Sequence, residues 1–154
     1  MNVVVVSGHP RAGSRTSGLA GEVGRAFAAK RGGPDPAVVH VSALGADLLV
    51  ADAPATADAL ALIRGAGLLV VATPTYKGAY TGLLKVLLDH LPARALDGIP
   101  AVTVVTAGIA PQAEAAEGHL HALLGELGAL VTTPGLTVVE SDLSDARAIA
   151  LKYA

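Results

Sequence analysis

A segment rich in glycine, hydroxyl groups and arginine lies near the amino terminus and has the composition of an anion-binding loop. This segment, loop one (residues 7–17), reads SGHPRAGSRTS. Glycine lets backbone N–H groups turn toward a ligand, hydroxyl groups add donors, arginine adds positive charge, and a helix that begins here adds its positive end. The Gly-Lys-Ser/Thr of a P-loop is absent, and the five-residue step from Gly8 to Gly13 does not fit a dinucleotide-binding fingerprint. Loop one therefore favours a phosphate monoester, and the simpler alternative is that Ser14 or Thr16 only caps a helix.

Loop two (residues 73–82, TPTYKGAYTG) contains two of the three tyrosines of the chain, Tyr76 and Tyr80. Pro74 and Gly78 predict a rigid turn at this point. A flat apolar ring could lie against such a turn, with backbone N–H groups facing the heteroatoms of the ring. An exposed loop with a packing tyrosine is an equally good interpretation of loop two taken alone.

Loop three (residues 106–111, TAGIAP) is the third candidate segment. Gly108 would let the backbone approach a ligand closely. Many turns from a strand to a helix have this composition, so loop three carries weight only together with the other two loops.

The three loops follow segments that are predicted to be strands. Short apolar runs alternate along the chain with Ala- and Leu-rich segments of helical period. The predicted strands are residues 2–7, 37–42, 67–73 and 101–106, with a fifth inside 129–139. The predicted helices are residues 15–31, 54–65, 81–91, 111–128 and 142–154, the last with Ser141 or Asp142 as its N-cap. Because the strands are continuously apolar rather than alternating, we expect a parallel sheet covered on both faces, as in a doubly wound α/β fold. Such sheets bind ligands outside the carboxyl ends of their strands, where the three loops lie.

Composition indicates one globular domain and excludes several functions. The 154 residues, 52% of them hydrophobic, predict a single domain that spans residues 1–154. A net charge of −2 and an aromatic content of 3% argue against nucleic acid as a partner. The absence of cysteine excludes disulfides, thiolate nucleophiles and cysteine–zinc sites. No targeting segment and no apolar stretch of about 18 residues is present, so we expect a cytoplasmic protein with no membrane partner.

Together the three loops resemble those of the NADPH-dependent FMN reductases. The resemblance rests on GHPR and SRTS in loop one, on PTYKGAYTGLLKVLLD from Pro74 to Asp89, and on TAG at the start of loop three. The flavin reductases of two-component alkanesulfonate monooxygenase systems are the most similar branch. The resemblance covers the chain up to about Leu130. It implies a flavodoxin-like three-layer α/β/α sandwich with a five-stranded parallel sheet.

The resemblance also implies the cofactors and the residues that bind them. FMN would be cofactor or substrate, and NADPH or NADH would donate the hydride. The phosphate of FMN would lie against loop one, and its isoalloxazine ring would lie between loops two and three. The residues implied to contact the flavin are His9, Arg11, Ser14, Arg15, Thr16, Ser17, Pro74, Thr75, Tyr76, Lys77, Gly78, Thr106, Ala107 and Gly108.

No side chain is expected to act as a catalytic acid, base or metal ligand. In flavin reduction the cofactors carry the chemistry and the protein supplies orientation. The GxSxG elbow of hydrolases and the HExxH pattern of zinc enzymes are both absent. His119 and His121 are two residues apart, so on a helix they point to different faces and are expected at the surface or at an interface.

Two positions depart from the pattern of the family. His9 stands where such loops usually carry serine. The segment Glu117-Gly118-His119-Leu120 lacks the aromatic residue that forms a π-bulge in the two-component branch. The sequence therefore leaves two alternatives: a reductase that releases reduced flavin, and a reductase that keeps FMN tightly bound.

The helix predicted from Leu83 to Leu91 is apolar almost all round. Burial of one face would not cover such a helix, so we expect self-association, and the family implies a homodimer or a homotetramer. Lys85 and Asp89 are four residues apart, and they would pair within the helix or lie at the contact between subunits.

The sequence is consistent with two hypotheses about function. The first is an NAD(P)H-dependent FMN reductase that supplies reduced flavin to a partner monooxygenase or reduces quinone-like acceptors. The second is a flavodoxin-type electron carrier that binds FMN without oxidising a nicotinamide. Carriers have strongly acidic docking faces and large aromatic residues beside the flavin, whereas this chain has a net charge of −2 and no tryptophan. The enzyme is therefore favoured, and His9 leaves room for a third hypothesis, a flavodoxin-like module without cofactor.

Overall fold

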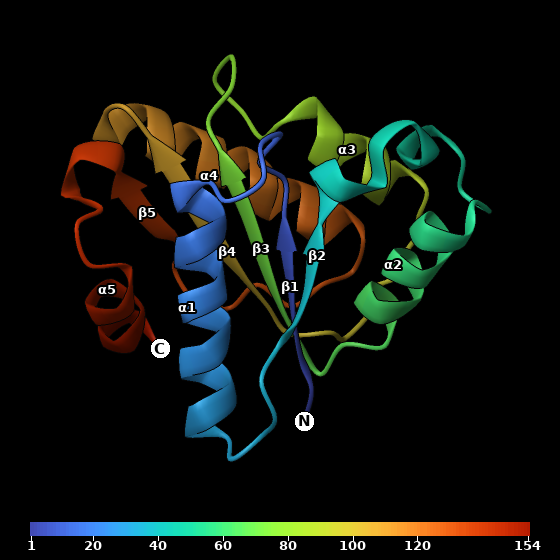
Figure 1. The fold of residues 1–154 in the computed structure, drawn as a ribbon, viewed down its shortest axis with the longest axis horizontal. Coiled ribbons are helices and arrows are strands. Elements are labelled where there is room, and N and C mark those ends of the chain that lie inside the picture. The colour runs from blue at the N-terminus through green and yellow to red at the C-terminus, as the bar shows by residue number, and fades with distance from the viewer.

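A five-stranded parallel sheet forms the centre of the protein, and the computed structural model describes all 154 residues (Figure 1). The strands are β1 (Val3–Ser7), β2 (Ala37–His40), β3 (Leu68–Pro74), β4 (Ala101–Ala107) and β5 (Leu136–Val139). The helices are α1 (Arg15–Lys30), α2 (Pro54–Arg64), α3 (Gly82–Asp89), α4 (Ala110–Glu126) and α5 (Ala146–Tyr153). Two 3₁₀ segments, η1 (Val41–Leu49) and η2 (Glu140–Asp142), follow β2 and β5. The strand order is β2-β1-β3-β4-β5 and every neighbouring pair is parallel, which confirms the predicted α/β fold.

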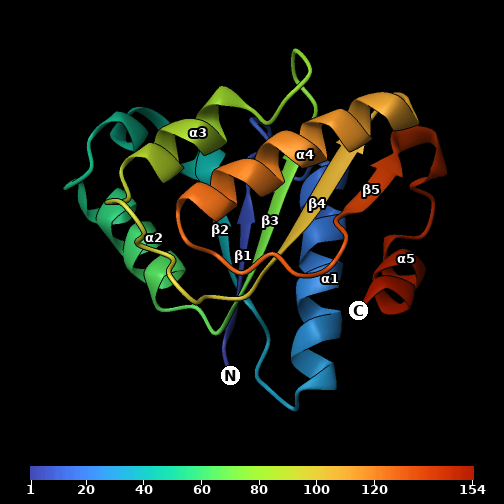
Figure 2. The same ribbon diagram turned by 180° about the vertical axis from the view of Figure 1, so that it is seen from behind.

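Helices cover both faces of the sheet, so the molecule has three layers (Figures 1 and 2). Helices α1 and α5 pack on one face, and α2, α3 and α4 pack on the other. Every residue of β1, β3 and β4 is buried. Such burial agrees with the continuously apolar sequence of these strands, which predicts a sheet covered on both faces. None of the helices combines the length and the apolar character needed to cross a membrane.

The second strand is shorter than its sequence predicts. The apolar run indicates a strand through Ser42, whereas β2 ends at His40 and the chain continues as η1. The strand lies at the edge of the sheet and pairs only with β1. Within η1, Gly45 adopts a positive φ of 55°, and Val41 and Leu48 are buried. Apolar content alone does not distinguish a strand from a 3₁₀ segment whose apolar residues reach the same core.

The N-cap predicted for the last helix, Ser141 or Asp142, is wrong. Asp142 ends η2, and α5 begins at Ala146. The N-cap is Asp145, whose carboxylate accepts a hydrogen bond from the N–H of Ala148 at 3.0 Å. Four serine and aspartate residues stand in this short segment, and all of them are good N-caps. Local sequence therefore does not decide which of them begins the helix.

Helix α3 is covered on one side by its own subunit. Its buried residues are Leu84, Leu87 and Leu88. Leu83 and Val86 are half-buried at the margin of the core. Lys85 Nζ donates to the carboxylate of Asp89 at 2.8 Å, so the expected intrahelical pair forms within one subunit. These two half-buried residues are the apolar part of α3 that remains for contact with another molecule.

Candidate functional site

Loop one joins the end of β1 to the start of α1 and leaves backbone N–H groups free. The N–H of Gly8 donates to a carbonyl of β3 at 2.8 Å, which fixes the start of the loop on the sheet. Helix α1 begins at Arg15, and its N-cap is Ser14, whose Oγ accepts from the N–H of Ser17 at 3.1 Å. The N–H groups of Arg15 and Thr16 have no acceptor within the protein. Free N–H groups at the positive end of a helix can bind an anion.

The hydroxyl groups of loop one already have partners within the protein. The Ser14 hydroxyl donates to Ser17 Oγ at 2.9 Å, and the oxygens of Ser17 and Ser7 lie 2.6 Å apart. The oxygens of Thr16 and Thr106 lie 2.8 Å apart, which joins loop one to loop three. These five side chains are at most 8% exposed. The capping role considered for Ser14 is present, and the backbone N–H groups are the donors of this loop that lack partners.

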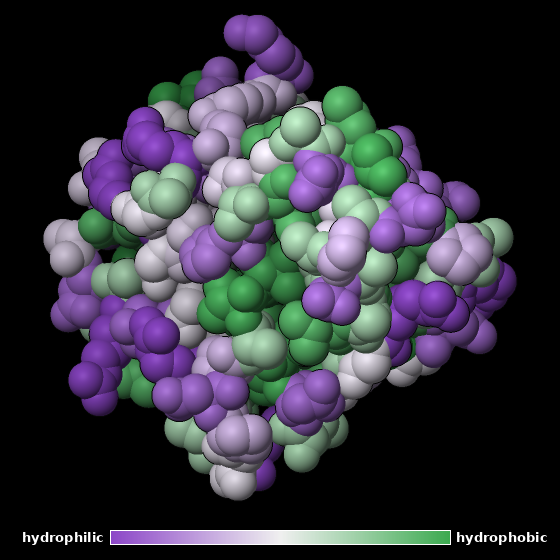
Figure 3. Space-filling view, turned by 45° about the vertical axis from the view of Figure 1, so that its right-hand side comes forward, coloured by the Kyte–Doolittle hydropathy of each residue, from purple (hydrophilic) through white to green (hydrophobic).

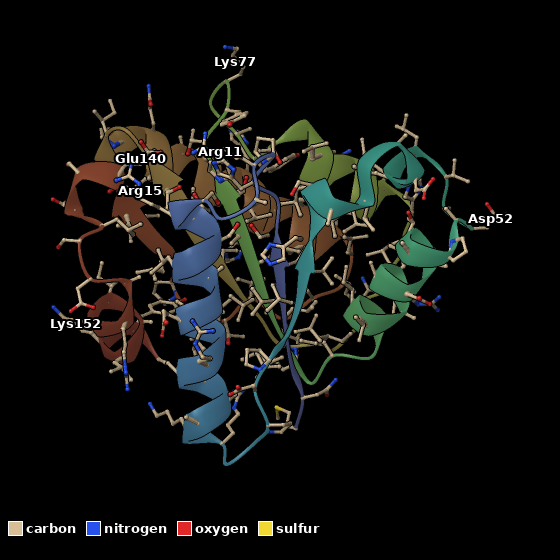
Figure 4. The ribbon with its side chains drawn as sticks, in the orientation of Figure 1. Arg11, Arg15, Asp52, Lys77, Glu140 and Lys152 are labelled. Carbon is tan, nitrogen blue, oxygen red and sulfur yellow. The ribbon has the colours of Figure 1, made fainter.

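Loop one also carries two arginines. Arg11 and Arg15 are both exposed. Arg15 Nη1 donates to the carbonyl oxygen of Glu140 at 3.2 Å, and its Nη2 lies 3.9 Å from the Glu140 carboxylate (Figure 4). Glu140, which no sequence motif marks, reaches loop one from η2. An ion pair this exposed contributes roughly 0–1 kcal/mol, so Arg15 can turn to an anionic ligand at little cost.

His9 connects loop one to loop two. Its Nδ1 accepts a hydrogen bond from the N–H of Arg11 at 3.0 Å, so the neutral ring carries its proton on Nε2. Partial burial, and next the positive charge of Arg11, lower the pKa of His9 below its ordinary value of 6.5. The imidazole is edge-on to the ring of Tyr76, with centroids 6.4 Å apart. His9 is therefore neutral at pH 7 and can replace a serine hydroxyl as a neutral donor.

Loop two leaves β3 as a two-residue hairpin turn. Tyr76 and Ala79 pair in antiparallel fashion through N–H···O bonds of 2.9 and 3.2 Å. Lys77 and Gly78 between them both have positive φ, 52° and 82°, as in a type I′ turn. Tyr76 is 47% exposed, and the side chain of Lys77 projects away from the molecule at the tip of the loop (Figure 4). Tyr76 can therefore contact a ligand at the sheet edge, whereas Lys77 does not line that edge.

Loop three follows β4 and lies beside loop two. The hydroxyl of Thr75 donates to the carbonyl oxygen of Thr106 at 2.9 Å. Ala107 is buried at the end of β4, and Gly108 is exposed, with nothing within 4 Å of the position a Cβ would take. Because β1, β3 and β4 are adjacent and parallel, the structure brings the three predicted loops together at the carboxyl edge of the sheet.

Two buried threonines that sequence analysis did not single out hold these loops together. The hydroxyl of Thr81 donates to the carbonyl oxygen of Gly8 at 2.6 Å and accepts from the N–H of Leu84 at 3.2 Å. The N–H of Thr81 donates to Thr73 Oγ1 at 3.1 Å. The predicted helix start at residue 81 is the signal that marks Thr81, since threonine is a good N-cap.

Two hollows of the surface lie beside the loops rather than between them. A hollow of about 630 Å³ lies between β5, α5 and the first residue of α4, to one side of the loops. A hollow of about 320 Å³ adjoins Pro10, Ala12 and Gly13 of loop one and extends to His40 and Ser42. No three His, Cys, Asp or Glu side chains are grouped so that they could hold a metal ion. The arrangement can bind an anion and orient a ring, and it contains no acid–base pair.

Comparison with known proteins gives one consistent relationship. The family described as NADPH-dependent FMN reductase matches residues 1–143. The FMN reductase (NADPH) of Escherichia coli (strain K12) is 37% identical over 150 residues, which cover 94% of this chain and 76% of that protein. The NADH-dependent FMN reductase SfnF of Pseudomonas putida is 37% identical over 113 residues, which cover 70% of this chain and 61% of that protein. The chain therefore spans about three quarters of one relative and less than two thirds of the other.

Solved structures give the same relationship for the fold. The apo form of an NADH:FMN oxidoreductase (EMOB) superposes with a TM-score of 0.84 at 29% identity, over 99% of this chain and 90% of that chain. A flavodoxin from the domain Archaea superposes with a TM-score of 0.65 at 18% identity, over 100% of this chain and 96% of that chain. The second match is a likeness of fold alone, and it confirms the flavodoxin-like architecture.

Proposed function

This chain belongs to the NADPH-dependent FMN reductase family, and from that premise we propose that loops one, two and three bind FMN while a nicotinamide reduces it. The prediction of an oxidoreductase that acts on FMN with NADPH or NADH is confirmed by this membership, and the flavodoxin-type carrier is set aside.

The free N–H groups at the start of α1 are the observation that supports this site most strongly. In the proposed complex the phosphate of FMN accepts hydrogen bonds from the N–H groups of Arg15 and Thr16, which have no other acceptor. The guanidinium groups of Arg11 and Arg15 add positive charge, and His9 adds a neutral donor. Charge-assisted hydrogen bonds of this kind contribute about 1.5–3 kcal/mol each. The hydroxyls of Ser14, Thr16 and Ser17 act indirectly, by fixing the backbone of the loop.

Loops two and three would border the isoalloxazine ring. Tyr76 supplies an exposed aromatic surface, Thr75 fixes loop two to loop three, and Gly108 leaves open space beside both. When bound, FMN would supply the hydride acceptor and NAD(P)H the hydride, so the redox chemistry would belong to the cofactors. The protein contributes orientation, which for well-placed reactants is equivalent to roughly 7–11 kcal/mol of the barrier. Lys77 projects outward and could meet the dinucleotide from outside the ring site.

The assembly that we propose is a homodimer or homotetramer formed through α3. Leu83 and Val86 of that helix are half-buried within the subunit, so a partner could cover them. A competing apolar region lies on the side that β2, η1 and α2 form, where Figure 3 shows hydrophobic residues gathered between hydrophilic ones. Exposed apolar residues of these elements are Leu49 and Val50 at the end of η1 and Leu62 on α2, and Val38 of β2 is exposed on the side of the sheet that α1 covers. Leu83→Glu should yield monomers, whereas Val38→Glu should leave the oligomer intact. Light scattering of micromolar samples measures both, and a monomeric wild-type protein would contradict the proposal.

The reduced flavin would leave the protein and serve a partner monooxygenase, as the resemblance to the two-component branch implies. We propose that this activity takes place in the cytoplasm. The uninterrupted α4, with no π-bulge at Gly118, marks the structural difference from that branch. Protein purified without bound flavin would support release, and protein purified with stoichiometric FMN would indicate a tightly held cofactor.

Turnover of nicotinamide tests the proposed function. The purified protein should oxidise NADPH or NADH rapidly when FMN is added and slowly without it. Measuring both nicotinamides at equal concentration establishes the preferred donor. Oxidation that FMN does not stimulate, together with no bound flavin, would refute the proposal.

A further inference from the structure

Thr81 occupies the junction of loop one, loop two and α3. Its side chain is 2% exposed. The hydroxyl is the N-cap of α3, since it accepts the N–H of Leu84, and it also donates to the carbonyl oxygen of Gly8. No other donor in the protein reaches that carbonyl. The Thr81 hydroxyl is therefore a direct link between loop one and the helix that follows loop two.

The contact around this link is closely packed. A Cβ built on Gly8 would lie 2.7 Å from Leu84 Cβ and 3.1 Å from Thr81 Oγ1. Gly8 and Leu84 are themselves buried. Without the Thr81 hydroxyl, the Gly8 carbonyl would be buried without a partner, and loop one would have to move away from α3 to reach water.

A separate bond closes the base of loop two. The backbone N–H of Thr81 donates to Thr73 Oγ1, and the Thr73 hydroxyl donates to the carbonyl oxygen of Pro74 at 2.7 Å. Neither bond uses the Thr81 hydroxyl. Removal of the hydroxyl therefore releases loop one while the base of loop two keeps its hydrogen bonds.

We propose that Thr81 is a positioning residue that sets the distance between loop one and loop two and thereby selects flavins that carry a terminal phosphate. The proposal rests on the proposed function, in which FMN contacts both loops at once. A ligand that contacts both loops depends on their separation. Riboflavin has the same ring without the phosphate, and it depends on loop two and loop three alone.

The test compares FMN and riboflavin as ligands of Thr81→Val, which keeps the shape of threonine and removes the hydroxyl. Fluorescence titration should show an FMN Kd raised about tenfold, the effect of losing one hydrogen bond to the phosphate when loop one is displaced, and a riboflavin Kd within about twofold of wild type. Thr81→Ser should restore both values. The matched control is Thr56→Val, because Thr56 is also fully buried and donates to a backbone carbonyl, that of Asp47, at 2.7 Å. It should change neither Kd.

The outcomes separate this proposal from the proposed function. An equal rise in both Kd values, or an unchanged FMN Kd, in Thr81→Val would overturn the positioning role. Wild-type protein that binds no FMN would instead overturn the proposed function. If Thr81→Val does not fold, as judged by circular dichroism, Thr81→Ala removes the same hydroxyl from a smaller side chain, and the same selective loss of FMN affinity is expected.

Discussion

Gly8 is the position where a single methyl group should disturb the flavin site through the packing of loop one on α3. In Gly8→Ala the new Cβ would lie 2.7 Å from Leu84 Cβ. The neighbour is attached directly to the helix backbone, so it cannot rotate aside. Ordinary contact begins at about 3.4 Å, so loop one and α3 must separate by about 0.7 Å.

The cost of this separation follows from two effects. Overpacking of a buried contact costs about 1–3 kcal/mol. The displacement also weakens the bond from the Thr81 hydroxyl to the Gly8 carbonyl, which contributes about 0.5–1.5 kcal/mol. We expect the free energy of unfolding to fall by about 2–4 kcal/mol and the Tm to fall by about 4–16 °C.

Urea unfolding of Gly8→Ala measures the loss of stability, and FMN titration of the same samples measures the disturbance of the flavin site. The control is Gly21→Ala in α1, where the new Cβ would make ordinary contact at 3.6 Å with the flexible guanidinium of Arg25. That substitution should stabilise the protein by about 0.5–1 kcal/mol, because alanine favours a helix interior over glycine. A Gly8→Ala protein that matches wild type in both stability and FMN affinity would refute the close packing of loop one on α3.

Three further substitutions test the site. In fluorescence titrations, Arg15→Gln should weaken FMN binding about tenfold and leave riboflavin binding unchanged. The loss of the exposed contact with Glu140 should alter the free energy of unfolding by less than about 1 kcal/mol. Equal losses of affinity for both flavins would contradict a phosphate contact. Burial and the charge of Arg11 lower the pKa of His9 in the folded state. Below pH 6.5 the unfolded chain therefore binds more protons than the folded protein. The contribution of His9 to stability is complete above that pH and is lost as the pH falls. His9→Asn should therefore flatten the dependence of unfolding free energy on pH in this acid range, and an unchanged profile would argue against the assignment. Lys77→Asn places asparagine at a positive φ of 52° in a type I′ turn, which should stabilise the protein by up to about 1 kcal/mol in thermal unfolding; a lower Tm would show that the hairpin does not need that conformation.

The sheet and its loops could be predicted because their sequence pattern has few alternatives. The runs of β1 and β3 are apolar at every central position, and only burial on both faces accommodates such strands. The placement of loops one, two and three at one edge then follows from parallel strands that are neighbours in the sheet. The start of α5 was mispredicted because Asp142 and Asp145 are equally good caps locally, and packing of the following turns decides between them.

The direction of individual hydroxyl groups could not be predicted from the sequence. Thr16 carries a hydroxyl that could bind phosphate, but its Oγ1 lies 2.8 Å from Oγ1 of Thr106, a residue 90 positions away. The contact between Glu140 and Arg15 likewise joins segments 125 positions apart. Thr81 carried only the local signal of a helix cap, although its hydroxyl also reaches Gly8 across 73 positions. Partners this distant depend on the tertiary structure.

Calorimetric titration of the wild-type protein with FMN and, in parallel, with riboflavin tests the phosphate site most directly. We predict saturable binding of FMN with an affinity at least about tenfold higher than that of riboflavin, because one charge-assisted hydrogen bond to the phosphate already corresponds to that ratio. Equal affinity for the two flavins, or no saturable binding of FMN, would contradict a phosphate held at the start of α1.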